Sequence, residues 1–107
     1  GSHLDTQPTG GRFDGIYGVL AGLEVVRTLN DHKLETDAPI DIVVWTNEEG
    51  CRFAPSMAGS GVFAGALGYD DVMARRDRAG KTFGDELRRI GYAGDAGLGR
   101  PGADPRK

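Results

Sequence analysis

Apolar residues recur at helical spacing through positions 16–29 of the chain. The positions that share this three- and four-residue spacing are Ile16, Val19, Leu20, Leu23, Val26 and Leu29. Such spacing places the side chains along one stripe of a helix. Asp14 precedes the stripe at the position that an N-cap residue takes. The pattern therefore predicts an amphipathic helix that begins after Asp14 and ends near residues 30–32.

A short run of β-branched and aromatic residues follows a connection at 34–39. The run consists of Ile40, Ile42, Val43, Val44 and Trp45. This composition is typical of a strand buried on both faces. Residues 1–6 fit the end of an earlier buried strand, and 7–11 form a loop with one proline and two glycines. Strand, helix and strand in this order predict a βαβ unit, so the expected fold class is α/β with a parallel sheet.

Beyond Gly50 the pattern is weaker. A loop is expected at 53–58, with short helices at 60–67 and 70–76. Residues 82–90 predict an amphipathic helix with Phe83, Leu87 and Ile90 on one side. From residue 93 the chain holds small residues, glycine, proline and charge, which have little to bury and predict a disordered tail.

Composition narrows the class of protein. The chain has 107 residues, enough for one modest domain, and its 18 glycines indicate many sharp turns. A formal net charge of -3 with mixed signs gives no polyanion-binding surface, so no nucleic-acid partner is expected. No apolar run approaches the roughly 20 residues that cross a membrane, and no signal peptide is recognisable. One cysteine fits a reducing compartment, and we expect a cytoplasmic protein.

Candidate chemistry follows the expected strands. His3 and Asp5, Asp14, and the Glu48–Glu49 pair lie at or just beyond strand ends, where ligand sites of α/β sheets form. Imidazole and carboxylate bind divalent ions such as zinc or manganese. Asp5, two residues after His3 on an extended chain, faces the same way and can accept its second N–H. The adjacent glutamates point apart, so one can bind metal while the other takes a proton from water.

Each feature also has a structural interpretation without chemistry. His3 fits a surface residue, Asp14 a simple cap, and the two glutamates a solvated turn. Residues 59–65 either shape the wall of a site or only pack as a tight loop and short helix. Arg52 is either an anion contact or a surface residue. Cys51 is interpreted as a small filler and not as a further metal ligand.

Three motifs change the balance between these interpretations. GSHLDT, GGRFDGIYGVL and VVWTNEEG resemble the metal-binding core of the M20-type metallopeptidase and amidohydrolase superfamily. The longer GSHLDTQPTGGRFDG and WTNEEGCRFAPSMAGSGVFAG resemble its branch of N-carbamoyl-L-amino-acid hydrolases, β-ureidopropionases and allantoate amidohydrolases. The resemblance implies that residues 1–94 are a fragment of a zinc-exopeptidase-like catalytic domain, a mostly parallel sheet flanked by helices. Residues 95–107 are then expected to be a non-family tail.

The resemblance also implies residue roles. His3 and Glu49 would each bind one of two divalent metal ions (zinc, or manganese, cobalt or nickel), and Asp14 would bridge both. Glu48 would be the general base, and Asp5 would orient His3. A cis peptide is expected at Asp14–Gly15. The family has two further histidine ligands and a dimerising lid domain downstream. His32 matches neither histidine, so we predict that this chain alone neither folds stably nor catalyses, and that the parent enzyme is a homodimer.

The implied reaction is hydrolysis of the carbamoyl C–N bond of N-carbamoyl-L-amino acids, or of N-carbamoyl-β-alanine. The small-molecule substrate would yield an amino acid, carbon dioxide and ammonia. Allantoate amidohydrolase, or another M20 peptidase or deacylase, remains an alternative within the superfamily. A non-catalytic metal-binding or interaction module is the alternative from a different class.

Overall fold

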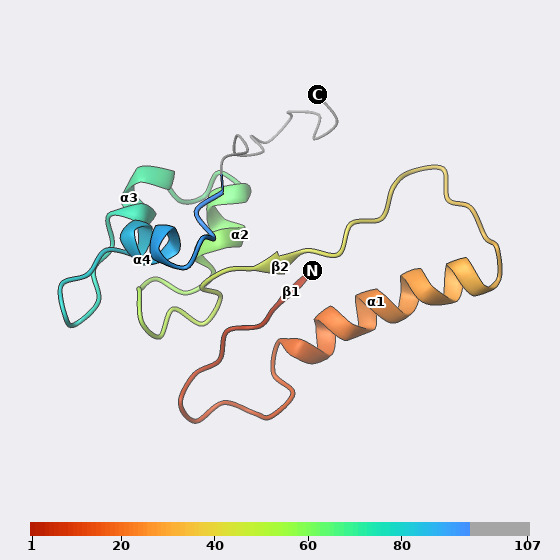
Figure 1. Ribbon diagram of the computed structural model, residues 1–107, viewed down its shortest axis with the longest axis horizontal. Helices are drawn as coiled ribbons and strands as arrows, with labels where there is room; N and C mark the ends of the chain where they lie inside the picture. The colour runs from red at the N-terminus through yellow and green to blue at the C-terminus, as the bar shows by residue number, and fades with distance from the viewer. Residues whose placement is uncertain (95–107) are drawn as a thin grey trace. The chain divides into compact units, whose positions relative to one another are not determined.

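The computed structural model describes residues 1–94, and the chain divides into two compact units, Gly1–Thr46 and Asn47–Lys107. The first unit is a βαβ arrangement (Figure 1). Its elements are β1 (Ser2–His3), α1 (Ile16–Asp31) and β2 (Val44–Trp45). The strands are parallel, with Ser2 opposite Val44 and His3 opposite Trp45. This confirms the predicted α/β class, the parallel pairing and the position of the helix.

The second strand is shorter than its apolar run predicts. Regular pairing covers Val44 and Trp45, and the Ser2 N–H adds one bond to the Val43 carbonyl at 3.1 Å. Burial on both faces is wrong for this run, because Ile40 is 48% exposed and Val44 is 45% exposed. A strand is buried on both faces only where layers cover both sides of its sheet. The first unit contributes α1 as its one helix.

Close packing sets α1 against β1. A Cβ at Gly18 would lie 2.7 Å from the Ser2 Oγ atom, so glycine allows the two elements to approach. The Ser2 hydroxyl also donates a hydrogen bond to the Gly15 carbonyl at 2.7 Å. These contacts hold the start of α1 beside Ser2 of β1, the residue that precedes His3 in the chain.

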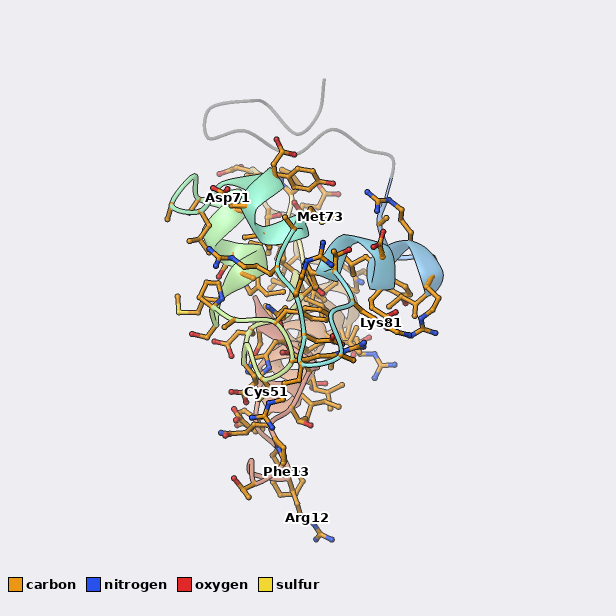
Figure 2. The ribbon with its side chains drawn as sticks, turned by 90° about the vertical axis from the view of Figure 1, so that its left-hand side faces the viewer. Arg12, Phe13, Cys51, Asp71, Met73 and Lys81 are labelled. Carbon is orange, nitrogen blue, oxygen red and sulfur yellow. The ribbon has the colours of Figure 1, made fainter. Side chains whose placement is uncertain are left out.

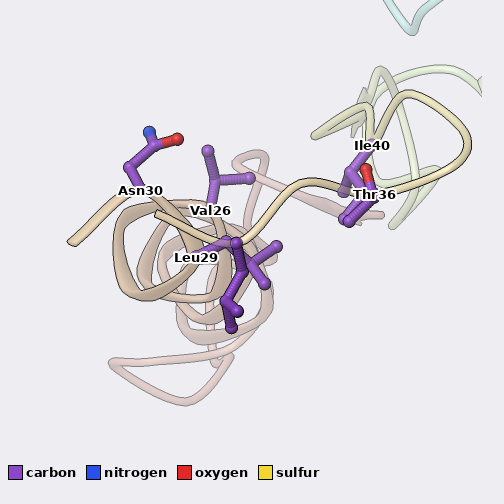
Figure 3. A pocket seen from close by; sticks show the side chains of 6 residues that line it. Val26, Leu29, Asn30, Thr36 and Ile40 are labelled. Atoms are coloured by element: carbon purple, nitrogen blue, oxygen red, sulfur yellow. The ribbon is translucent and has the colours of Figure 1, made fainter. Parts of the chain in front are cut away.

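The other surfaces of α1 remain open. No residue of the helix is buried, and Phe13 in the preceding turn is 72% exposed (Figure 2). A hollow of about 160 Å³ lies between the end of α1 and the following segment (Figure 3). Its lining residues are Val26, Leu29, Asn30, Leu34, Thr36 and Ile40. The apolar stripe of the helix is therefore only partly covered within the first unit.

In residues 47–94, the described part of the second unit, the chain forms three short helices. They are α2 (Ala58–Phe63), α3 (Tyr69–Met73) and α4 (Phe83–Arg89). The helix predicted at 82–90 is confirmed, with the Thr82 side chain accepting from the Asp85 N–H as N-cap. The other two predicted helices, 60–67 and 70–76, begin close to the observed starts, but their predicted ends lie too far along the chain, since α2 ends at Phe63 and α3 at Met73. Helix α2 ends early because the Leu67 N–H turns back to the Gly61 carbonyl at 3.0 Å.

A small aromatic core holds the second unit together. Its buried members are Phe53, Ala58, Val72 and Phe83. The Phe53 and Phe83 rings lie 5.3 Å apart between centroids and are tilted by 56°. Leu87 packs against this core as predicted, but Ile90 is 53% exposed at the end of α4. The predicted apolar side of α4 therefore covers the core with its first two members.

The predicted disordered tail falls largely on residues 95–107, which lie outside the described residues. Within residues 1–94, no helix combines the length and the apolar character that crossing a bilayer requires.

Candidate metal centre

His3 lies at the end of β1 and is buried, with 8% of its surface exposed. Its Nδ1 atom is 2.8 Å from the Asp5 main-chain carbonyl. A carbonyl oxygen only accepts hydrogen bonds, so we assign the ring proton to Nδ1. In the neutral ring the Nε2 atom then carries a lone pair, which is the form in which histidine binds a metal.

The Asp5 carboxylate lies farther from His3 than its carbonyl does. Its Oδ1 atom is 3.5 Å from His3 Nδ1, beyond the usual range of an N–H···O hydrogen bond. The main chain of Asp5 therefore makes the shorter contact to the ring, where the sequence predicts the side chain. The carboxylate still adds negative charge on the Nδ1 side of the ring.

Asp14 does not act as the predicted N-cap. The N-cap residue of α1 is Gly15, and no side chain makes a capping hydrogen bond there. The main chain of Asp14 instead forms a turn, in which its N–H donates to the Gly11 carbonyl at 3.2 Å. Its carboxylate faces His3, with Oδ1 3.8 Å from Nε2, and is 45% exposed. Since the carboxylate is not engaged in capping, it is available to a cation.

Gly15 allows the His3 ring to lie where it does. A Cβ on Gly15 would come within 2.6 Å of both His3 Nδ1 and Cε1, and the φ of Gly15 is +74°. A side chain here would both strain the main chain and displace the ring. The cis peptide expected at Asp14–Gly15 is wrong, because the cis bond in residues 1–94 is Ala54–Pro55. The turn into α1 is made by the positive φ of glycine.

The His3–Asp14 pair fits a divalent ion. Two ligands at about 2.1 Å from one tetrahedral zinc ion lie about 3.4 Å apart. The 3.8 Å between His3 Nε2 and Asp14 Oδ1 is close to that separation and too long for a good direct hydrogen bond. A neutral imidazole lone pair facing a carboxylate is also the donor chemistry that zinc and manganese accept.

Glu48 and Glu49 lie in the second unit, in the loop that follows Asn47. The Met57 N–H donates to the Glu48 carbonyl at 2.6 Å, and the Ala58 N–H donates to the Asn47 carbonyl at 3.2 Å. The structure therefore brings His3, Asp5 and Asp14 together within the first unit. The approach of Glu48 and Glu49 to these residues stays a prediction.

Comparison with known proteins decides the family. The profile of Peptidase family M20/M25/M40 matches residues 1–93. The chain belongs to this family. An N-carbamoyl-L-amino-acid amidohydrolase of Rhizobium meliloti is 62% identical to it over 92% of this chain and 24% of the relative. A protein of the same description from Geobacillus stearothermophilus is 44% identical over 89% of this chain and 23% of the relative.

Solved structures give the same result for this M20/M25/M40 chain. The crystal structure of an amidase of the hydantoinase/carbamoylase family from Burkholderia multivorans matches with a TM-score of 0.89 and 66% identity. That match covers 94% of this chain and 25% of the solved one. An allantoate amidohydrolase of Bacillus subtilis is 33% identical over 86% of this chain and 22% of the relative. The chain thus spans about a quarter of the length of the relatives it matches.

Arg52 forms ion pairs with two carboxylates of the second unit. Its Nε and Nη2 atoms contact one oxygen of Asp77 at 3.0 and 2.8 Å, and its Nη1 atom lies 2.9 Å from Glu86. The guanidinium also lies 4.9 Å from the centroid of the Phe53 ring. Arg52 is therefore ion-paired with carboxylates of the second unit. We assign it neither to a contact with a substrate anion nor to a free surface position.

These contacts shift the titration of the acidic partners. The hydrogen bond from Arg89 is the largest cause that lowers the pKa of Glu86 to about 2; desolvation opposes it, and the hydrogen bond from Arg52 adds to the lowering. The hydrogen bond from Arg52 likewise lowers the pKa of Asp77. The sequence alone did not reveal this network, because Arg52 lies 25 residues before Asp77 and shares no regular spacing with its partners.

Two further interpretations are resolved within the second unit. Cys51 is exposed, so it is not a packing filler (Figure 2). Gly61, inside the 59–65 segment, packs so closely that an added Cβ would lie 2.7 Å from the Leu67 side chain. This contact supports the packing interpretation of the segment. Sequence reasoning missed Gly15 as a site residue, although glycine directly after Asp14 at a helix start was the available signal.

Proposed function

We propose that the protein carrying this sequence hydrolyses the carbamoyl C–N bond of N-carbamoyl-L-amino acids in a metal-dependent reaction. The observation that carries the proposal is the buried His3 ring, whose Nε2 lone pair faces the Asp14 carboxylate at 3.8 Å. It occurs in a family member that is 62% identical to a protein named N-carbamoyl-L-amino-acid amidohydrolase.

His3, Asp14 and Glu49 are the residues that we assign to metal binding. In this proposal these residues would hold two divalent ions, zinc or else manganese, cobalt or nickel, with the Asp14 carboxylate serving both. Such ions would supply positive charge that acidifies water and stabilises negative charge on a substrate oxygen. The Asp5 carbonyl holds the His3 ring in the required tautomer, and the Asp5 carboxylate supports the proton on Nδ1.

Glu48 is the residue that we assign to proton transfer. Its carboxylate takes one proton from the attacking water while the water oxygen bonds to the carbamoyl carbon. It then delivers that proton to the substrate nitrogen as the C–N bond breaks. The products are the free amino acid and carbamic acid, which decomposes to carbon dioxide and ammonia. Glu49, adjacent in the chain, is assigned to metal binding and not to proton transfer.

We also infer the setting of the whole protein. The single cysteine supports a reducing compartment, and we place the protein in the cytoplasm. We expect it to act as a homodimer on a small-molecule substrate, through residues beyond the quarter of the family length present here. Light scattering of the full-length protein checks the dimer.

Hydrolysis of allantoate is the second candidate. It is favoured by the 33% identical allantoate amidohydrolase of Bacillus subtilis. The N-carbamoyl reaction is preferred because the more similar relatives of that description are 62% and 44% identical.

Substrate preference distinguishes these reactions, with ammonia measured for the carbamoyl compounds and allantoate, and free amino acid measured for the dipeptide. The full-length protein would be stripped with a chelator, reloaded with zinc or manganese, and assayed on N-carbamoyl-L-amino acids, N-carbamoyl-β-alanine, allantoate and a dipeptide. We expect the highest kcat/KM on an N-carbamoyl-L-amino acid, and no turnover before metal is restored. Preference for allantoate would support the second candidate, and turnover by the stripped protein would contradict metal dependence.

A further inference from the structure

Asn47 begins the second unit in an uncommon main-chain conformation. Its φ is +50°, in the left-handed region that asparagine tolerates better than most residues. Its side-chain Nδ2 atom donates to the Phe53 carbonyl at 2.6 Å and lies 3.4 Å from the Pro55 carbonyl. The amide of Asn47 thus reaches across the loop of residues 47–58 and joins its beginning to its far side.

The same loop is closed a second time around Glu48. The Met57 N–H donates to the Glu48 carbonyl at 2.6 Å, next to the bond between Ala58 and Asn47. Gly50 has a φ of +66°, and an added Cβ there would lie 2.5 Å from the Ser56 nitrogen. The main chain on both sides of the two glutamates is therefore held by the opposite wall of the loop.

We propose that Asn47 is a positioning residue for the Glu48–Glu49 pair. Its side-chain amide fixes the main chain from which both carboxylates extend, so that one is held for metal and the other for proton transfer. This inference rests on the proposed function of the two glutamates. Asn47 itself bonds main-chain carbonyls and is assigned no contact with metal or substrate.

The contacts and the main-chain conformation at position 47 both suit asparagine. The partners are carbonyl oxygens, so the side chain must donate, and a carboxylate cannot. The positive φ favours glycine, asparagine and aspartate over other residues. Asparagine alone among these three supplies an N–H donor. Aspartate keeps the shape and the tolerance of positive φ but turns an attraction to two carbonyls into a repulsion.

The test uses the full-length protein with Asn47→Asp and Asn47→Gly. Zinc affinity of the chelator-stripped protein is measured by competition with a chromophoric chelator, which needs no turnover, and kcat and KM are then measured separately. We expect zinc binding to weaken by about 10- to 100-fold in both variants, as for other residues that orient ligands. The loss of rate should appear in kcat, with KM changed less.

Two controls separate positioning from general destabilisation. Met57→Gly removes a side chain at another positive φ in the same loop, at +57°, and keeps the N–H that bonds Glu48. Leu87→Ala weakens the core of the same unit. Both should retain wild-type zinc affinity, although Leu87→Ala lowers the Tm.

Several outcomes would overturn the proposal. Wild-type zinc affinity and kcat in Asn47→Asp would do so, and if that variant does not fold, the same result in Asn47→Gly decides. An equal loss of zinc affinity in Leu87→Ala would attribute the effect to stability. A wild-type protein that binds zinc but does not hydrolyse N-carbamoyl amino acids would refute the proposed function. The zinc affinities of the Asn47 variants would still test the positioning role of Asn47.

Discussion

At the scale of single residues, the orientation of His3 depends on two main-chain features. The Asp5 carbonyl accepts from Nδ1 at 2.8 Å, and the bare Cα of Gly15 leaves room for the ring. Neither feature involves an atom that binds metal. Substitutions that leave every ligand intact should therefore weaken the site.

Gly15→Ala is the substitution that tests this dependence. The new Cβ would meet the His3 ring at 2.6 Å, so we expect zinc affinity to fall by about 10- to 100-fold. The positive φ adds a stability cost of about 1–3 kcal/mol. Gly91→Ala is the matched control, because Gly91 has the same φ of +74° but nothing within 4 Å of an added Cβ. Chelator competition and thermal melting on the full-length protein measure both effects.

Gly91→Ala should lower stability but retain the zinc affinity of wild type. Equal zinc affinity in Gly15→Ala and wild type would show that the ring does not depend on Gly15.

The sequence predicted the ligand candidates at this scale better than their surroundings. His3 and Asp14 are recognisable because imidazole and carboxylate follow a strand and precede a helix. The wrong capping role of Asp14 arises because glycine at position 15 occupies the N-cap. Whether the main-chain carbonyl or the side-chain carboxylate of Asp5 contacts His3 depends on ångström-scale geometry, which residue type does not encode.

At the scale of elements, charged side chains tie the loop after Asn47 to α4 and to the turn that contains Asp77. Arg52 contacts Asp77 and Glu86, and Arg89 contacts Glu86 from the next turn of α4, at 3.0 Å. Glu86 is buried, with 8% exposed, so loss of its charge would leave two guanidinium groups without their shared partner. The network therefore stabilises this unit in its ionised form.

Acid should weaken this network in a defined window. The pKa of Glu86 is lowered from 4.5 to about 2, chiefly by Arg89. A lowered carboxyl pKa stabilises the folded state fully above the unfolded value, and this contribution is lost as pH falls from about 4.5 towards 2. We expect Glu86→Gln to lower the Tm near pH 7 and to reduce the dependence of Tm on pH in that window.

Asp85→Asn is the control for this prediction. Asp85 pairs with Arg88 at 3.0 Å, but its side chain is 70% exposed, and such surface pairs contribute little. Identical pH dependence in Glu86→Gln and wild type would contradict the assignment to Glu86.

The aromatic core gives a second prediction for this unit. Phe83 is 7% exposed and faces Phe53, so Phe83→Ala should destabilise the protein by about 3–5 kcal/mol. Tyr92→Ala removes an aromatic side chain that is 79% exposed and should change stability by about 0.5 kcal/mol or less. Urea unfolding monitored by circular dichroism compares the two. Equal losses of stability in Phe83→Ala and Tyr92→Ala would show that the Phe53–Phe83 pair does not form the core.

Elements with a strong local pattern were predicted well, and those shaped by distant contacts were not. Helix α1 and helix α4 follow their apolar spacing closely. The end of α2 depends on Leu67 returning to Gly61, and the length of β2 depends on how much of β1 is opposite. The partner of β2 lies far away in the sequence, and the bond from Leu67 to Gly61 leaves no apolar periodicity that would reveal it.

At the scale of the whole molecule, apolar surface exceeds what the described residues cover. Tyr17, Leu20 and Val25 of α1 are 74%, 55% and 52% exposed. Exposed apolar side chains in such numbers are typical of surfaces that pack against further protein. The relatives are about four times as long, since the chain spans 24% of one of them.

This exposure predicts the behaviour of the 107-residue chain on its own. We expect it to aggregate or melt without cooperativity, and to show no carbamoylase turnover with zinc or manganese. Light scattering, thermal melting and an ammonia assay measure these properties. A monodisperse, cooperatively melting and active chain would contradict the prediction.

Glu48→Gln in the metal-loaded full-length protein tests the central claim most directly. If Glu48 transfers the proton, the variant keeps the metal content of wild type while kcat on an N-carbamoyl-L-amino acid falls by about 10²- to 10⁴-fold. Glu24→Gln, which removes a carboxylate from the exposed surface of α1, should keep wild-type kcat. Wild-type turnover in Glu48→Gln would contradict the account.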